Sequence, residues 1–314
     1  VEMRFADDLT TSKPFDRAWS NDDIVADLRA CQTAVHAWGA ANRVTFEPSK
    51  EEFAVLATVG GSEGTFKFLV AVVDSKLHMN ACVDKLVRKM RAKARCLLRC
   101  QRHFSLHGMI ALYKAHVRSL VEWCTPAIYH VARSKLAQLD NVQAWFMRKL
   151  GLTEGEAFLQ HNVAPLQLRR DVAMLGVLWK VSRERCHTRM SAMFPLLPAR
   201  PVCERLTRAQ HAQHSRRFVD YCDGGQLSQF ARSLFGLVKV WDSLPQKFVD
   251  APTACALQKM LTQAARAACQ TECDVWHDFM LLKVFQFQQP AGFVQPYDHF
   301  IAVGVCFKPY CVFL

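Results

Sequence analysis

Helix-period apolar residues dominate the chain from Met79 to about residue 270, and patterns typical of strands are absent there. Residues 83–98 carry an apolar stripe, while lysines and arginines occupy the other faces. Similar stripes cover residues 106–121 and 136–150, and Gly151 stands at the C-cap position of the latter. Stripes of this kind are buried by packing one helix on another, so this part is predicted to be a helical bundle.

The first 75 residues instead mix strand and helix patterns. Residues 1–9 alternate with the period of two that is typical of a half-buried strand. Ser20, with Asp23 three residues later, predicts the start of an amphipathic helix that ends near Gly39. Further strands are predicted over residues 44–46, 53–59 and 66–73. The predicted fold class is therefore an α+β N-terminal part followed by a mostly α-helical remainder.

The chain is cationic, with 40 Lys and Arg against 28 Asp and Glu and a formal net charge of +12. Between residues 79 and 150 there are fourteen Lys or Arg and three acids, so nearly all the excess charge lies in the first helices. This concentration favours a polyanionic partner, most often nucleic acid. On charge alone, a merely solvated helix face fits equally well.

Composition also bears on compartment. The longest apolar run is the eight residues Phe300–Phe307, against about 18 for a membrane span, so we expect a soluble protein with no membrane partner. The sequence around Val1 is unlike a signal peptide, and we expect a truncated start. Thirteen cysteines at irregular spacing, an odd number, predict reduced thiols in an intracellular protein.

Two adjacent carboxylates, Asp7 and Asp8, follow the apolar residues of the first predicted strand. On a tight turn both can face one spot, where they repel each other unless a proton or a cation intervenes. The pair is therefore either solvated or a site for a hard divalent ion such as Mg²⁺. So short a motif is weak evidence for a metal site by itself. The order of the features that follow it along the chain strengthens that evidence.

In that order the chain resembles the reverse transcriptases of non-LTR (LINE-type) retrotransposons, over roughly residues 1–265. Residues 5–9 (FADDL) are similar to the aromatic-x-Asp-Asp box of the polymerase palm, and residues 42–50 to the next palm segment. Residues 68–77 resemble the strand pair of the primer grip. The basic helices resemble the thumb, and residues 240–245 (VWDSLP) resemble the Trp-Asn-x-Leu-Pro signature that follows it.

This resemblance implies an RNA-directed DNA polymerase that transfers nucleotides by a two-metal mechanism to a DNA 3′ end on an RNA template. Asp7 and Asp8 would be catalytic residues and ligands of two Mg²⁺ ions, and Lys50 the acid toward pyrophosphate. The implied primer grip is Phe68, Leu69, Val70 and Asp74. The implied nucleic-acid contacts are basic residues of the thumb: Lys85, Arg88, Lys89, Arg91, Lys93, Arg95, Arg99, Lys114 and Arg118.

The resemblance also implies a domain layout. Residues 1–75 would be the C-terminal half of the palm with the primer grip, 76–155 the helical thumb and 156–270 a helical connector, while the tail 271–314 matches no known segment. The partners would be RNA template, DNA primer or target DNA, and deoxynucleoside triphosphates. The expected location is the nucleus and cytoplasmic ribonucleoprotein.

Fingers and the upstream palm aspartate of the family have no counterpart in this sequence, so we expect the chain alone to be inactive. The alternative is a decayed or co-opted helical fragment that binds nucleic acid without catalysis. The sequence also departs from the family at three places. Residues 10–14 are polar and include a proline, which argues against a second hairpin strand. Val70-Ala71 replaces a usual glycine, and Glu51 adds charge beside Lys50.

Two other patterns were weighed. Cys96, Cys100, His103 and His107 have zinc-like spacing, but on one continuous helix they span about 16 Å and need a chain break near Phe104 to close a tetrahedron. Buried thiols with surface histidines are therefore expected there. Cys269, Cys273 and His277 lack a fourth ligand. The tryptophans expected in the core, rather than as base-stacking platforms, are Trp123, Trp145 and Trp179.

Overall fold

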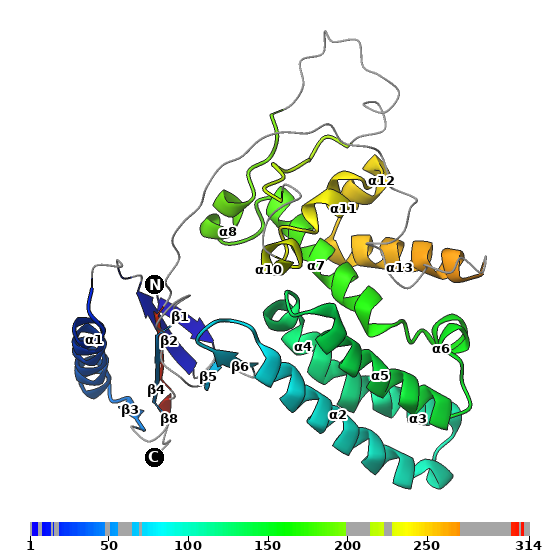
Figure 1. The fold of residues 1–314 in the computed structure, drawn as a ribbon, viewed down its shortest axis with the longest axis horizontal. Helices are drawn as coiled ribbons and strands as arrows, with labels where there is room; N and C mark the ends of the chain where they lie inside the picture. Colours follow the sequence, from blue (N-terminus) through cyan, green and yellow to red (C-terminus); the bar gives the residue numbers. More distant parts are fainter. Residues whose placement is uncertain are drawn as a thin grey trace. The chain divides into compact units, whose positions relative to one another are not determined.

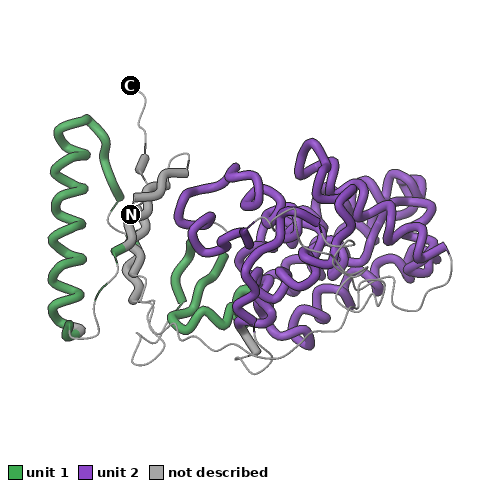
Figure 2. Tube along the Cα trace, turned by 90° about the horizontal axis from the view of Figure 1, so that it is seen from above, with its two compact units in different colours: residues 1–82, 295–314 green, residues 83–294 purple. Residues whose placement is uncertain are grey.

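The computed structural model describes residues 2–5, 8–13, 15, 19–47, 51–55, 65–68, 71–198, 214–222, 228–270, 303–307 and 309–310. The chain forms two compact units (Figures 1 and 2). Unit 1 is Val1–Cys82 with Gln295–Leu314, and unit 2 is Val83–Val294. The protein is mostly helical, with small antiparallel sheets in unit 1, which confirms the predicted α+β layout at this coarse level.

The chain begins with an antiparallel hairpin. Strands β1 (Glu2–Phe5) and β2 (Asp8–Lys13) pair with Phe5 opposite Asp8. The argument against a second hairpin strand was therefore wrong. The polar strand β2 is paired on both sides, with β1 and with β7 (Val303–Phe307), and it ends at Lys13, before the proline. β7 also pairs with β4 (Glu52–Val55), which gives the strand order β1-β2-β7-β4.

Helix α1 (Asn21–Ala41) begins where the sequence predicts and ends two residues beyond Gly39. The Ser20 hydroxyl accepts a hydrogen bond from the Asp23 backbone N–H at 3.2 Å, which satisfies one of the free donors of the first turn. Its inner face packs in a small core with strand β3 (Thr45–Phe46), which pairs with β8 (Pro309–Tyr310). The buried members of this core are Phe15, Ile24, Leu28 and Phe46.

The face of α1 that packs is not centred on Trp38, which is 49% exposed. Gly39 lies against β3 instead, so closely that a Cβ atom there would be 2.7 Å from the Phe46 ring and 2.7 Å from the Val44 carbonyl oxygen. The missing side chain lets Phe46 lie on the helix backbone. Because the Gly39 side of α1 faces β3, the side chain of Trp38 points away from β3 and stays exposed.

The single strand predicted over residues 66–73 is a strand pair. β5 (Thr65–Phe68) and β6 (Ala71–Asp74) are antiparallel, with Phe68 opposite Ala71. Apolar residues continue from the first strand into the second without a break. Such a pattern alone does not show where a chain reverses direction, so it predicts one strand.

Unit 2 begins with helices that agree with the predicted stripes. They are α2 (Asn80–Arg99), α3 (Leu106–Tyr113), a π-helical stretch (Lys114–Arg118), α4 (Ser119–Ile128) and α5 (Arg133–Lys149). Gly151 follows α5 with a φ of +77°, the left-handed conformation that favours glycine at this position.

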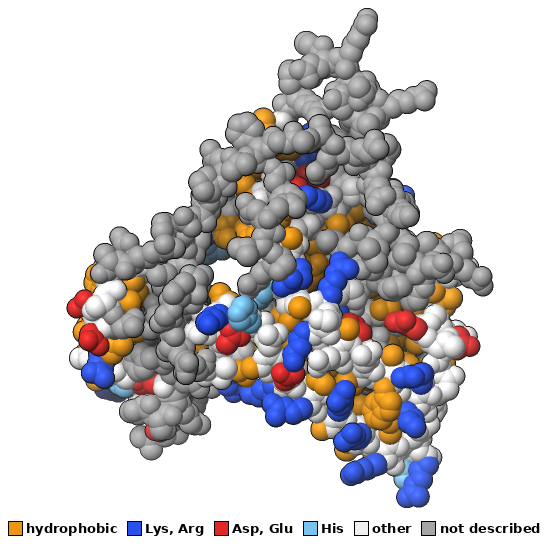
Figure 3. All heavy atoms as spheres, viewed as in Figure 1, with side chains coloured by type: hydrophobic (Ala, Val, Ile, Leu, Met, Phe, Trp, Pro, Cys, Tyr) orange, Lys and Arg blue, Asp and Glu red, His pale blue; other side chains and the backbone are white. Residues whose placement is uncertain are grey.

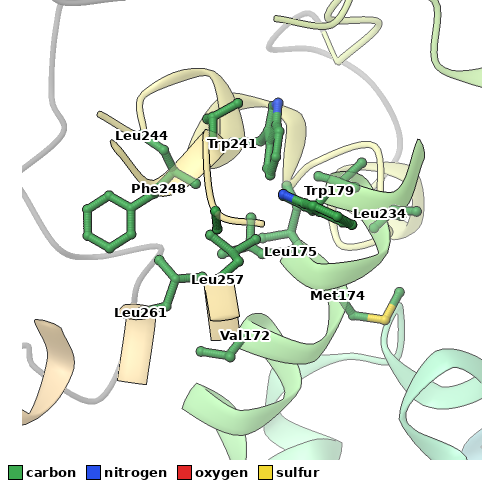
Figure 4. Close-up of a cluster of buried hydrophobic side chains, with 14 of the residues drawn as sticks. Val172, Met174, Leu175, Trp179, Leu234, Trp241, Leu244, Phe248, Leu257 and Leu261 are labelled. Carbon is green, nitrogen blue, oxygen red and sulfur yellow. The ribbon is translucent and has the colours of Figure 1, made fainter. Parts of the chain in front are cut away.

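The remaining helices are α6 (Glu154–His161), α7 (Leu166–Ser182), α8 (Thr188–Met193), α10 (Ser228–Ala231), α11 (Val238–Asp242), α12 (Gln246–Val249) and α13 (Ala254–Gln270). Helix α7 lies at the centre of a core built with α11, α12 and α13 (Figure 4). Trp179 and Trp241 are both buried there. Within the described residues, no helix combines the length and the apolar character that crossing a membrane requires.

The VWDSLP segment ties the residues around position 216 to this core. The Trp241 indole N–H donates to the Arg216 carbonyl oxygen at 2.9 Å, and the His214 ring donates from Nε2 to the Trp241 carbonyl oxygen at 2.8 Å. The Phe218 backbone N–H donates to Asp242 Oδ1 at 3.1 Å. Burial raises the pKa of Asp242 to about 7, although this hydrogen bond and the Arg217 charge oppose the rise.

Candidate nucleic-acid interface

Helix α2 is apolar on one face and cationic on the others. Val83, Met90 and Ala94 are fully buried, because they face the other helices of unit 2. Six cationic side chains of the helix are exposed, and Figure 3 shows Lys and Arg gathered along the edge of the unit that α2 forms. They are Arg88, Lys89, Arg91, Lys93, Arg95 and Arg99, whereas Lys85 is half-buried.

The arginines and lysines of α2 lie on different sides of the helix. Arg88, Arg91, Arg95 and Arg99 are spaced by three, four and four residues, which places them in one row about 16 Å long, the arginine stripe. The lysines at positions 85, 89 and 93 are spaced by four and form a second row. One guanidinium group can donate two parallel hydrogen bonds to two oxygens of the same phosphate. The arginine stripe is therefore better suited than the lysine row to bind a phosphate backbone.

No described acid opposes the arginine stripe, because each of the three acids of residues 79–150 is paired elsewhere. Asp84 forms an ion pair with Lys135 at 2.7 Å. Asp140 pairs with the buried Arg170 at 2.8 Å. Glu122 pairs with both Arg118 and Arg169. Within the described part of the chain, none of the six exposed cations of α2 has an ion-pair partner.

Two of the predicted contact residues are used inside the fold. Lys114 donates from Nζ to the His161 carbonyl oxygen at 2.6 Å, at the C-terminus of α6. Arg118 pairs with Glu122, with 3.2 Å between Nε and Oε1. Burial, together with neighbouring arginines, lowers the pKa of both side chains. The structure thus separates these two from the exposed row on α2, which the sequence pattern did not do.

A cleft of about 300 Å³ lies between α2 and α5, lined by Arg91, Arg95, Asn141, Val142 and Trp145. The two helices run in the same direction, because Asp84 meets Lys135 at one end and the cleft brings Arg91 to the middle of α5. Asn141 and Trp145 are one turn apart and share the face of α5 outside its apolar stripe. That placement is the signal in the sequence from which the cleft could have been predicted.

The tryptophans have different environments, so the prediction that all three belong to the core is only partly right. Trp179 is 2% exposed and is a core residue, as predicted. Trp123 is 56% exposed, so its prediction was wrong. Trp145 is half-buried and lines the cleft. Helical spacing shows which residues share a face of a helix. It does not show which of those faces is covered by a neighbouring helix.

The inner face of α5 is held by a buried hydrogen-bond chain. The Tyr113 hydroxyl donates to Gln143 Oε1 at 2.9 Å, and Gln143 Nε2 donates to the Ala164 carbonyl oxygen at 3.0 Å. The Tyr113 ring stacks on Phe146, with 4.8 Å between ring centroids. Burial raises the pKa of the Tyr113 hydroxyl. Helices α3 and α5 therefore meet in the core, and this contact holds the α5 side of the cleft in place.

The predicted palm residues fall in unit 1. Asp8 opens β2 at the end of the first hairpin, while Asp7, Lys50, Leu69 and Val70 lie outside the described residues, as does the side chain of Asp8. Phe68 ends β5 and is half-buried. Asp74 ends β6, and its carboxylate accepts hydrogen bonds from the backbone N–H groups of residues 78 and 79, at 2.8 and 2.6 Å. Asp74 thereby shapes the turn that leads into α2.

Glu51 directs its charge toward α1. Its side chain is 1% exposed, and its Oε1 lies 2.7 Å from His36 Nε2. Gln32 donates a further hydrogen bond to the other carboxylate oxygen. The carboxylate that the sequence adds beside Lys50 is therefore engaged by two side chains of α1.

Cys96, Cys100, His103 and His107 are interrupted by the break in the helix that a zinc site would need. A 3₁₀ turn (Gln101–His103) and the extended residue Phe104 interrupt the helix. The two histidines are exposed as expected, but Cys96 and Cys100 are exposed rather than buried, because they lie on the side of α2 opposite the buried Ala94. Among the described side chains, no three that could ligate a metal come together.

Comparison of the chain with protein-family models, with curated proteins and with solved structures gives no match.

Proposed function

We propose that the chain is the palm end, thumb and connector of a reverse transcriptase of the non-LTR retrotransposon type, and that α2 binds the phosphate backbone of its template and primer. The observation that carries this proposal is the arginine stripe, an exposed row of cations with no described acid opposite it. A merely solvated helix face normally mixes both signs of charge. The order of palm-like and thumb-like segments along the chain supports the proposal that the activity is that of a polymerase.

In this function the thumb residues act by neutralising phosphates. Each phosphate that Arg88, Arg91, Arg95 or Arg99 contacts releases a condensed counterion, which gives affinity that falls steeply with salt. Such contacts hold the duplex in register and are independent of sequence. The Asp84–Lys135 ion pair joins α5 to α2, and the buried hydrogen bond between Tyr113 and Gln143 joins α5 to α3, so that the binding surface is formed before the nucleic acid arrives.

The palm residues would complete the reaction. Asp7 and Asp8 follow each other in the sequence, and carboxylate oxygens are the donors that Mg²⁺ prefers. Bound there, Mg²⁺ would stabilise the attacking and leaving oxygens of nucleotidyl transfer. Lys50 would donate a proton toward the leaving pyrophosphate. Two carboxylates are half of a two-metal site, so full activity would need a further carboxylate ligand.

The second candidate is a helical fragment that binds nucleic acid without catalysis. It rests on the arginine stripe alone and needs none of the palm-like segments. Primer extension with Mg²⁺, an RNA template and a DNA primer separates the two. Extension that Asp7→Ala abolishes supports the polymerase, and a folded chain that binds the template and primer without extending it supports the fragment.

The binding itself is tested with a fluorescent RNA·DNA hybrid and anisotropy at several salt concentrations. Replacing Arg88, Arg91 and Arg95 by Gln should lower the slope of log affinity against log salt by about 2 to 3, because each lost phosphate contact removes about 0.9. The matched control replaces three exposed cations on other helices of unit 2, Arg189, Lys247 and Lys259. Equal losses in the two triple variants would refute a specific role for α2.

A further inference from the structure

The cleft between α2 and α5 has a composition that phosphate binding alone does not explain. Its floor includes Val142, which is 2% exposed, and one wall is the half-buried Trp145. A solvated phosphate contact needs no aromatic wall. The other side of the cleft is the middle of the arginine stripe, Arg91 and Arg95. One aromatic and two arginine side chains line this recess, and these are the residue types that bind the two chemical parts of a nucleotide, its base and its phosphate.

The size of the cleft restricts what enters it. A volume of about 300 Å³ is at the lower end of the range for small-molecule pockets and has no room for a duplex. One flat group with an attached phosphate is the size that fits. An unpaired base exposes both faces and its hydrogen-bonding edge, whereas a paired base in a duplex exposes neither face.

We infer that this cleft binds one unpaired nucleotide of a single strand, with the base stacked on Trp145 and its phosphate held by Arg91 and Arg95. The inference rests on the proposed function, since it assigns a substrate class to part of the same surface. Asn141 carries a donor and an acceptor on one amide and lines the same cleft one turn from Trp145, so its amide is the group available to pair with a base edge. Stacking tolerates any base, so a preference for single strands over duplexes follows, with little preference for sequence.

The support beneath the cleft keeps this geometry rigid. Residues adjoining the cleft on α5 are anchored by Gln143, which is 4% exposed and hydrogen-bonded to Tyr113 and Ala164. The Asp84–Lys135 ion pair joins α2 and α5 near their N-termini. The two helices that carry Trp145 and the arginines are therefore held together by contacts that the nucleotide does not have to form.

The test measures the affinity of the full chain for two probes, a uridine homopolymer single strand and a blunt RNA·DNA hybrid duplex. Trp145→Ala should weaken single-strand binding about tenfold, since one stacked base contributes about 1–3 kcal/mol. Binding to the duplex should stay within twofold. Trp145→Phe, which keeps an aromatic face and guards against a folding defect, should retain most of the single-strand affinity. Trp123→Ala, at an exposed tryptophan of α4, is the matched control and should change neither affinity.

A second readout is the emission of 2-aminopurine placed in the single strand, because stacking quenches this base analogue. The wild type should quench it and Trp145→Ala should not. Retained duplex binding with equal single-strand affinity in wild type and Trp145→Ala would overturn the inference and leave the proposed function standing. Equal losses on both probes would also overturn it. A wild type that binds neither probe would overturn both.

Discussion

Asp242→Asn should stabilise the protein at neutral and alkaline pH. Asp242 stands where the resembled signature has asparagine, and its Oδ1 accepts a hydrogen bond from the Phe218 backbone N–H at 3.1 Å. Asparagine keeps that acceptor and removes the charge. Because burial raises the pKa of this carboxyl from 3.8 to about 7, the wild-type protein must either hold a proton there or bury a charge beside Trp241.

The sign of the pH dependence follows from the direction of this shift. Between pH 3.8 and about 7 the folded state holds a proton on Asp242 that the unfolded state has released, so stability falls as the pH rises. It falls by at most about 1.4 kcal/mol per pH unit, or about 4 kcal/mol over the whole interval. Since the carboxyl keeps some contact with solvent, we expect about 2 to 4 kcal/mol.

Urea unfolding followed by tryptophan fluorescence at pH 5 and pH 8 measures the effect. The stability gain from Asp242→Asn should be about a third of its full size at pH 5, because that pH lies about a third of the way from 3.8 to 7, and should reach about 2 to 4 kcal/mol at pH 8. Hydrogen exchange in residues 214–222 and 238–249 should slow at pH 8, which localises the gain. Glu184→Gln, which removes an exposed carboxylate elsewhere in the same unit, is the control and should not reproduce the gain at pH 8. If Asp242→Asn and the wild type lose stability equally between pH 5 and 8, the carboxyl does not titrate in that interval and the reasoning is refuted.

Two further substitutions test the packing on which the units depend. Gly39→Ala should destabilise unit 1 by about 1 to 3 kcal/mol, because the new Cβ would lie 2.7 Å from the Val44 carbonyl oxygen; thermal melting measures this. Gly155→Ala, another helical glycine whose Cβ would make only ordinary contact, should stabilise slightly, and an equal loss in both variants would contradict the clash. Tyr113→Phe leaves the buried Gln143 Oε1 without its donor and should cost about 1 to 3 kcal/mol in urea unfolding, so an unchanged midpoint would argue against the hydrogen bond.

The sequence alone determined much of the local structure. The cap at Ser20 located the start of α1, and Gly151 located the end of α5, because capping needs only residues within one turn. The apolar stripe of residues 83–98 predicted both the buried and the cationic sides of α2. The excess of lysine and arginine in residues 79–150 indicated that a polyanionic partner would bind to the helices that include α2. Each of these depends on the order of neighbouring residues, which the sequence contains in full.

Tertiary structure decided which of those residues are available. Lys114 and Arg91 look equivalent in a basic sequence, but one caps a neighbouring helix and the other lines a cleft. Trp145 and Trp179 share a helical pattern and differ in burial. The pKa of Asp242 and the cleft between α2 and α5 both depend on contacts between residues that are far apart in the chain. Such contacts follow from how whole helices pack, and a local pattern of apolar and charged residues does not fix that packing.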